Sequence, residues 1–179
     1  MRSTNYAKWQ NFLLFQLIWF IATLGRESLE WLLILLLVAH LSICADRKAE
    51  LRIMVLCAGL GSGADMTLTL MGVFVFSPAP SLLPIPIWLI ALWFGFAATL
   101  RHSLSYLVTR PTIAILAAGI AAPISYGAGM RLGAVDFGLD TPFTIVLIGG
   151  LWTVLMAVFI LICRLNVSGG PVAQPSAAS

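Results

Sequence analysis

Apolar residues follow one another along this chain in long runs, which short polar segments separate. A helix needs about 20 apolar residues to cross the hydrocarbon core of a bilayer. Six runs approach or exceed this length, and they predict helices at residues 9–25, 29–44, 51–76, 86–108, 111–130 and 142–163. The second run is short for a span, so its helix should stand nearly upright. The pattern predicts an all-α protein, a polytopic bundle of six transmembrane helices.

The segments between the runs are too short to hold a soluble catalytic domain. Residues 77–86 are rich in proline and uncharged, which predicts a stiff, extended connection. The residues from 166 onward are mostly Gly, Pro, Ala and Ser, a composition typical of disorder. We therefore expect one transmembrane helical domain over residues 1–165 and a disordered tail over residues 166–179.

The basic residues orient the bundle. If the N-terminus lies in the cytoplasm, only Arg26 and Arg131 fall on the outer side. The other basic residues then fall on the cytoplasmic side, and they are Arg2, Lys8, Arg47, Lys48, Arg52, Arg101, Arg110 and Arg164. This bias follows the positive-inside rule. It predicts that both chain ends are cytoplasmic, with Trp9, Trp31 and Trp88 as interfacial anchors.

Composition supports a membrane solvent. Hydrophobic residues make up 60% of the chain and charged residues 9%, whereas a soluble domain has about 25% charged residues. The mean hydropathy is +1.01. The net charge of +3 is spread along the chain without a basic patch, which argues against nucleic acid as a partner. Membrane lipids are the expected partners.

One carboxylate lies deep inside the third run. Asp65 follows the cytoplasmic start of that helix by about 20 Å, which places it near the middle of the bilayer. A charge there costs at least about 2.5–3.5 kcal/mol. Small and polar residues share its helix face, namely Ala58, Gly61, Ser62, Thr69 and Gly72. Two interpretations stay open: a proton or ligand site, and a hydrogen-bonded aspartate that holds two helices together.

Two histidines are further candidates. His102 shares a helix face with Trp88, Gly95 and Thr99, so it is expected to point into the bundle and is interpreted as functional. His40 is expected to be an interhelical hydrogen-bond donor. The neighbouring charges are read more simply, Arg101 as a membrane anchor and Glu30 as an interfacial charge.

The fifth run combines small residues with a proline. Pro123 predicts a kink, which frees backbone carbonyls beside the hydroxyls of Ser125 and Tyr126. Asn11 and Gln16 in the first run add two amides. These groups are candidates for a shared polar pocket. The residues expected to serve helix packing are Gly61, Ser62, Thr69, Gly95, Thr99, Pro123 and Gly129.

Signatures of known chemistry do not occur in the sequence. Cys44, Cys57 and Cys163 show no metal-ligand spacing and are read as small buried hydrophobic residues. Neither an HExxH motif nor a Walker-type loop is present. We therefore expect no metal and no cofactor, and a non-catalytic role is favoured over an enzyme.

A set of short runs forms a pattern over nearly the whole chain. It consists of Asn11-Phe12, Phe15-Gln16, Trp19, Asp65, Pro86-Ile87-Trp88, Ala91-Leu92-Trp93, Phe96-Ala97, Thr99-Leu100, His102-Ser103-Leu104, Ala122-Pro123, Ser125-Tyr126, Ala128-Gly129 and Leu132-Gly133-Ala134. This pattern resembles a small family of bacterial inner-membrane proteins of unknown function. Arg101 departs from the asparagine expected before the histidine.

The resemblance implies a bacterial inner membrane as the location. Genes of such proteins lie near those of lipid-modifying methyltransferases and flavin-dependent oxidases, so the resemblance also implies a role in membrane-lipid metabolism. Three hypotheses result. The first is a non-catalytic accessory protein that binds an acyl-lipid or apolar metabolite for lipid-modifying enzymes. The alternatives are a small proton-coupled transporter or flippase that uses Asp65, and an intramembrane enzyme that uses His102 and Asp65.

Overall fold

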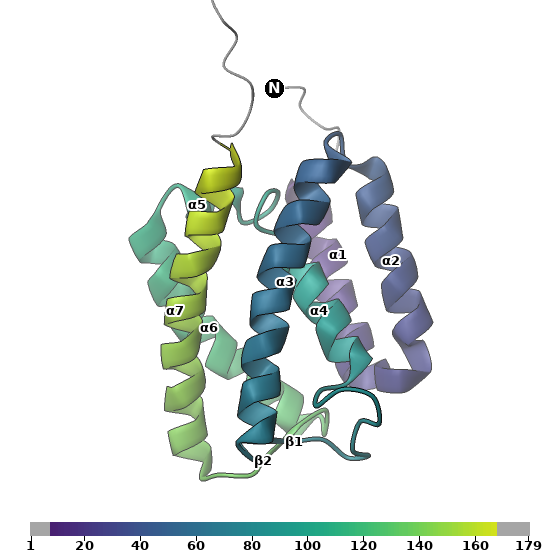
Figure 1. Ribbon diagram of the computed structural model, residues 1–179, viewed down its shortest axis with the longest axis vertical. Helices are drawn as coiled ribbons and strands as arrows, with labels where there is room; N and C mark the ends of the chain where they lie inside the picture. The colour runs from purple at the N-terminus through teal and green to yellow at the C-terminus, as the bar shows by residue number, and fades with distance from the viewer. Residues whose placement is uncertain (1–7, 168–179) are drawn as a thin grey trace, which may run out of the picture.

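The computed structural model describes residues 8–167, and these residues form an all-α bundle (Figure 1). The chain begins with a helical hairpin of two helices, which two short irregular turns connect. The elements in order are α1 Lys8–Phe20, the π-helical turn η1 Ile21–Gly25, the 3₁₀ turn η2 Arg26–Leu29, α2 Glu30–Ile43, α3 Arg47–Leu70, β1 Phe74–Val75, α4 Ile87–Ala97, α5 Ser105–Val108, α6 Pro111–Arg131, β2 Asp136–Phe137 and α7 Thr141–Val167.

Three of these helices, α3, α6 and α7, are long and apolar enough to cross a membrane. The helix α4 is apolar but shorter, with 11 residues. The sequence prediction of an all-α protein is thus confirmed, and candidate membrane spans are present. A bundle of six spans stays a prediction.

The helix α4 is the centre of the molecule. It packs against α1, α2 and α3, and Ile87 is its only exposed residue. The helix α7 packs chiefly on α6 and also on α3. The start of α1 and the end of α7 lie at the same end of the bundle (Figure 1). The predicted tail from residue 168 onward lies outside the described residues.

The third predicted helix, 51–76, ends earlier than expected. The helix α3 stops at Leu70 because Gly72 takes a left-handed conformation, with φ +74°. The Val73 amide donates to the Leu68 carbonyl over 2.9 Å, and the Gly72 amide donates to the Thr69 carbonyl over 2.9 Å. These two hydrogen bonds together form the Schellman motif, in which glycine is the preferred residue after the helix end.

The helix α6 ends in the same way at Gly133, with φ +71°. Each of these two ends leads into a two-residue strand, and the strands pair antiparallel with Phe74 opposite Phe137. The segment after α3 and the segment after α6 are therefore tied together. Hydropathy alone had extended the third helix through β1.

The fourth predicted helix, 86–108, is broken. The helix α4 ends at Ala97, residues 98–104 form turns, and the short helix α5 follows. Hydroxyl groups compete for the backbone here: Thr99 Oγ1 donates to the Phe96 carbonyl over 2.6 Å, and Ser105 Oγ donates to the His102 carbonyl over 2.7 Å. Serine and threonine offer the chain such alternatives to a regular helix.

Two smaller expectations also change. Trp88 is buried at 3% exposure, whereas Trp9 and Trp31 are exposed like interfacial residues. Glu30 is not only an interfacial charge, because its Oε1 accepts the Trp88 backbone amide over 3.1 Å. Glu27 accepts the Trp88 indole N–H over 3.3 Å. Both carboxylates thus lie at the N-terminus of α4, where the helix dipole favours negative charge.

Candidate functional site

Asp65 bonds two side chains that line an aromatic pocket. It is buried at 1% exposure on the face of α3 that meets α4. Its Oδ2 accepts the indole N–H of Trp93 over 2.7 Å, and both of its oxygens lie 2.8 Å from the Tyr126 hydroxyl. One carboxylate therefore fixes two aromatic rings that come from α4 and α6.

The close approach of α3 to α4 depends on a glycine one turn before Asp65. A methyl group at Gly61 would overlap with the Trp93 ring. Trp93 in turn stacks on Trp152 of α7, with ring centroids 4.8 Å apart. The rings of α4, α6 and α7 thus form one aromatic layer over Asp65.

These rings line a pocket with a cavity volume of about 80 Å³. One water needs roughly 10–15 Å³, so the pocket has room for several heavy atoms of a ligand. Its walls are mostly aromatic and aliphatic, and Thr23, Ser125 and Tyr126 provide the hydroxyl groups. The lining residues are Phe15, Trp19, Thr23, Phe76, Trp88, Leu89, Leu92, Trp93, Phe96, Ser125, Tyr126, Gly129, Ala134, Val135 and Trp152.

A hydrogen bond between α1 and α6 crosses the edge of this pocket. The indole N–H of Trp19 donates to Ser125 Oγ over 2.9 Å. Both residues are half-buried, so this edge lies toward the outside of the bundle. Below it, Thr23 donates to the Trp19 carbonyl and turns its methyl group toward Gly129.

Near this pocket, Ser62 carries an unusual hydroxyl. Among the described residues, Ser62 Oγ is a buried side-chain atom without a hydrogen-bond partner. It lies one turn before Asp65 on the same face of α3. Thr69, one turn after Asp65, instead donates back to the Asp65 carbonyl over 2.8 Å.

A second polar cluster surrounds Glu50, one of the first residues of α3. Glu50 is buried at 1% exposure. Its Oε1 lies 3.1 Å from His40 Nε2, and its Oε2 lies 3.2 Å from His102 Nε2 and 3.1 Å from Arg101 Nη1. Cys44 Sγ lies 3.5 Å from His40 Nε2 and 3.7 Å from His102 Nε2. Arg101, which the sequence predicted as a membrane anchor, is thus a partner of a buried carboxylate.

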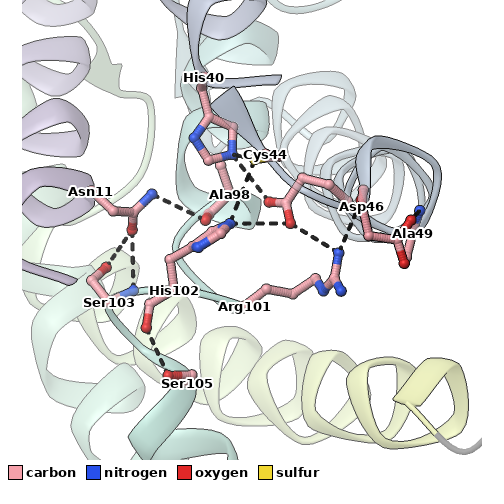
Figure 2. Close-up of polar contacts among 11 residues, drawn as sticks. Asn11, His40, Cys44, Asp46, Ala49, Ala98, Arg101, His102, Ser103 and Ser105 are labelled. Carbon is pink, nitrogen blue, oxygen red and sulfur yellow. Dashed lines mark hydrogen bonds and ion pairs between the residues drawn. The ribbon is translucent and has the colours of Figure 1, made fainter. Parts of the chain in front are cut away.

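Asn11 of α1 holds the broken segment that carries His102. Its amide N–H donates to the Ala98 carbonyl over 3.3 Å. Its Oδ1 accepts the Ser103 amide over 3.2 Å and the Ser103 hydroxyl over 2.7 Å. Asn11 therefore satisfies backbone groups that the end of α4 leaves without helical partners (Figure 2).

Except for Gln16, the candidate ligand and proton-site residues from the sequence lie at these two clusters. Asp65, Ser125 and Tyr126 lie at the aromatic pocket, whereas Asn11, His40 and His102 lie at the Glu50 cluster. The two clusters are about 22 Å apart along α3, because 15 residues separate Glu50 from Asp65. Gln16 is exposed and belongs to neither cluster. The candidates therefore do not form one shared polar pocket.

The residues expected to serve packing are mostly inside the bundle. Gly61, Ser62, Gly95, Thr99, Pro123 and Gly129 are buried, and Thr69 is half-buried. Gly95 lies against Ile18 of α1. Pro123 lies within α6, which continues through it, and it faces Gly149 of α7.

Three residues of these sites were missed by the sequence analysis: Glu50, Cys44 and Trp93. Glu50 lies just outside the predicted helix 51–76, but it begins the buried stripe that continues through Ile53, Met54, Cys57, Ala58 and Gly61. Its place on that helical face was a signal that could have identified it. Cys44 and Trp93 gave no comparable signal, because their partners are distant in sequence.

A family model described as "Protein of unknown function (DUF2878)" matches residues 8–158. This match is consistent with the resemblance to an uncharacterised family. No curated protein and no solved structure gives a significant match.

Proposed function

We propose that this chain, which belongs to DUF2878, a family of proteins of unknown function, binds an apolar metabolite or acyl-lipid without transforming it. The observation that carries this proposal is the aromatic pocket beside Asp65. Ligand pockets of this kind combine apolar walls with a few fixed polar groups. Here Ser125 and Tyr126 would orient the polar end of the ligand.

The proposal includes a membrane setting. We place all six helical segments in the bilayer of a bacterial inner membrane, with both chain ends in the cytoplasm. Interactions of four arginines support a common basic end: Arg47 donates to the Ser42 carbonyl, Arg52 to Asn166, Arg101 to the Asp46 carbonyl and Arg164 to the Val108 carbonyl. At the other end, Arg26 donates to the Leu132 carbonyl. The half-buried edge at Trp19 and Ser125 would then open toward lipid.

A binding role fits the contacts better than the two alternatives. Asp65 accepts hydrogen bonds from two pocket residues, so it has a structural role that does not require proton transport. The His102 and Asp65 pair that an enzyme would need is not formed, because each residue belongs to a different cluster. The partners of such a binding protein would be the enzymes that modify the bound lipid.

Photocrosslinking tests the pocket directly. We expect a diazirine-bearing fatty acid, added to the purified protein in phospholipid vesicles, to label residues of the pocket. Gly129→Leu should remove most of this labelling, because Gly129 lines the pocket and a leucine there fills it. Labelling spread over the lipid-facing surface, or unchanged by Gly129→Leu, would contradict the proposal.

Gly63→Leu is the matched control. It makes the same substitution in a helix, but a Cβ at Gly63 meets nothing within 4 Å, and Gly63 does not line the pocket. Both variants should keep the size-exclusion profile of the wild type, and Gly63→Leu should keep its labelling. Equal loss of labelling in both variants would show that the substitution acts by general disruption.

A lipidome comparison tests the accessory role. A deletion strain should lose a modified lipid species, and the wild-type gene should restore that species. The Gly63→Leu gene should restore it as well, and the Gly129→Leu gene should not. An unchanged lipidome in the deletion strain would remove the link to lipid modification while leaving the crosslinking result to decide on binding.

A further inference from the structure

Four side chains with metal-binding atoms meet at the basic end of the bundle. They are His40 of α2, Cys44 just after α2, Glu50 of α3 and His102 of the segment after α4. Each offers one ligand atom, and all four atoms lie within 4.8 Å of one another. Figure 2 shows the imidazoles of His40 and His102 directed toward the same place, with the guanidinium of Arg101 nearby.

Four distances between these groups are close to those between the ligands of a tetrahedral metal, and no two of the four ligand atoms are more than 4.8 Å apart. Zinc binds nitrogen and oxygen at about 2.0–2.1 Å and sulfur at about 2.3 Å, so neighbouring ligand atoms of a tetrahedron lie about 3.3–3.6 Å apart. Glu50 Oε1 lies 3.1 Å from His40 Nε2, and the other carboxylate oxygen, Oε2, lies 3.2 Å from His102 Nε2. The thiol of Cys44 lies 3.5 Å and 3.7 Å from the same two nitrogens. Small rotations of these side chains would admit one ion.

The donor set selects the metal. Two imidazoles, a thiol and a carboxylate suit Zn²⁺, whereas Mg²⁺ and Ca²⁺ prefer oxygen ligands alone. The thiolate and the carboxylate together cancel the two charges of the ion, and the thiol proton leaves to solvent on binding. Such cancellation matters because His40, Cys44 and Glu50 are buried. A neutral complex avoids an unpaired charge in a low-dielectric interior.

The surroundings hold these ligands in place. Arg101 Nη1 donates to Glu50 Oε2, as outer partners do for carboxylates that bind metals. Asn11 fixes the irregular backbone on both sides of His102 through the Ala98 carbonyl and the Ser103 amide. The position of His102 therefore does not depend on the regularity of a helix.

We propose that His40, Cys44, Glu50 and His102 form a binding site for one zinc ion that joins α2, α3 and the segment after α4. Four protein ligands leave no position for a substrate, so the site is structural rather than catalytic. It stands apart from the aromatic pocket and does not depend on a ligand there.

Metal content and cobalt substitution test the site. The protein purified in detergent from cells grown with zinc should hold about one zinc per chain. After chelation, added Co²⁺ should give the absorption of a tetrahedral site with a thiolate-to-metal charge-transfer band. Cys44→Ser should abolish this band and weaken zinc binding by more than roughly 100-fold, which is beyond the loss expected for an outer partner.

Cys57→Ser is the matched control, because Cys57 of α3 is buried like Cys44 but lies outside the cluster. It should keep the zinc content and the cobalt band. Zinc should raise the melting temperature of the chelated wild type and of Cys57→Ser, but not that of Cys44→Ser. A wild type without bound metal, with iron or copper in place of zinc, or with zinc that Cys44→Ser retains would overturn the proposal. If the residues form only a hydrogen-bonded His–Glu–His cluster, the wild type will hold no metal.

Discussion

Single residues decide how the aromatic layer is held. Asp65 accepts hydrogen bonds from two side chains that line the pocket, Trp93 and Tyr126. Gly61 lets the Trp93 ring lie directly on α3. The polar and the small residue thus act together, because the carboxylate can reach Trp93 only where the two helices approach closely.

Two substitutions of Asp65 should distinguish its role as a hydrogen-bond acceptor from the effect of its charge. Asp65→Leu leaves the Trp93 N–H and the Tyr126 O–H without an acceptor, which should cost about 1–3 kcal/mol for each donor. Asp65→Asn keeps an acceptor for Trp93 and a hydrogen-bonding group for Tyr126, so it should lose less. Thermal unfolding in detergent measures both. Equal stability of Asp65→Leu and the wild type would contradict this account.

Adding one methyl group at Gly61 should be destabilising. Gly61→Ala drives a Cβ into the buried Trp93 ring, and such overpacking costs about 1–3 kcal/mol. Gly59→Ala, half a turn away on the exposed side, meets nothing and should be neutral or stabilising by up to about 1 kcal/mol. Gly61→Ala should therefore lower the melting temperature, and Gly59→Ala should leave it unchanged or raise it. An equal fall in both variants would argue against the packing explanation.

Among the helices and turns, the break after α4 is the feature that brings the Glu50 cluster together. A regular helix over residues 86–108 would pair its backbone groups within itself. Because α4 ends at Ala97, the Ala98 carbonyl and the Ser103 amide turn to Asn11 instead. Buried irregular backbone of this kind needs other protein groups as hydrogen-bond partners. The helix α1 is therefore part of the support for His102.

Removing the Asn11 amide should loosen this segment. Asn11→Leu leaves the Ser103 amide and the Ala98 carbonyl unpaired, so peptides that cover residues 98–104 should exchange amide hydrogens faster. The unfolding free energy should fall by about 1–3 kcal/mol. Gln16→Leu changes an exposed amide of the same helix and should alter neither quantity. Faster exchange in both variants would mean that α1 as a whole was disturbed.

At the scale of the described molecule, the three candidate membrane spans expose apolar surface. Large apolar side chains such as Leu70, Leu116 and Val146 are exposed on α3, α6 and α7. Both the start of α1 and the end of α7 lie at one end of the bundle (Figure 1). An even number of crossings would produce this arrangement.

Cysteine labelling tests the proposed crossings. Ser81→Cys places a thiol in the exposed segment between β1 and α4, and Lys48→Cys places one at the exposed start of α3. A membrane-impermeant maleimide should label Ser81→Cys in intact spheroplasts and Lys48→Cys only after permeabilisation. The wild type should stay unlabelled, because its three cysteines are buried. Labelling of both variants from the same side would exclude the proposed topology.

The sequence by itself determined the class of protein and most of the helices. Length and hydropathy of an apolar run depend only on local composition, so the spans 111–130 and 142–163 agree closely with α6 and α7. The pattern of small residues around Asp65 likewise placed one face of α3 inside the bundle. The glycine after α3 and the hydroxyl residues after α4 were visible in the sequence as signals for a helix end. The apolar runs at 51–76 and 86–108 continue past these residues, however, so hydropathy did not show where α3 and α4 end.

Only the tertiary structure decided which polar residues meet. The partners of Asp65 are 28 and 61 positions away in the sequence, and His102 is 52 positions from Glu50. A single sequence carries no signal for such distant pairs, because each pair depends on how the helices pack. Cys44 looked like a small apolar residue for the same reason, until the fold placed two imidazoles and a carboxylate beside it.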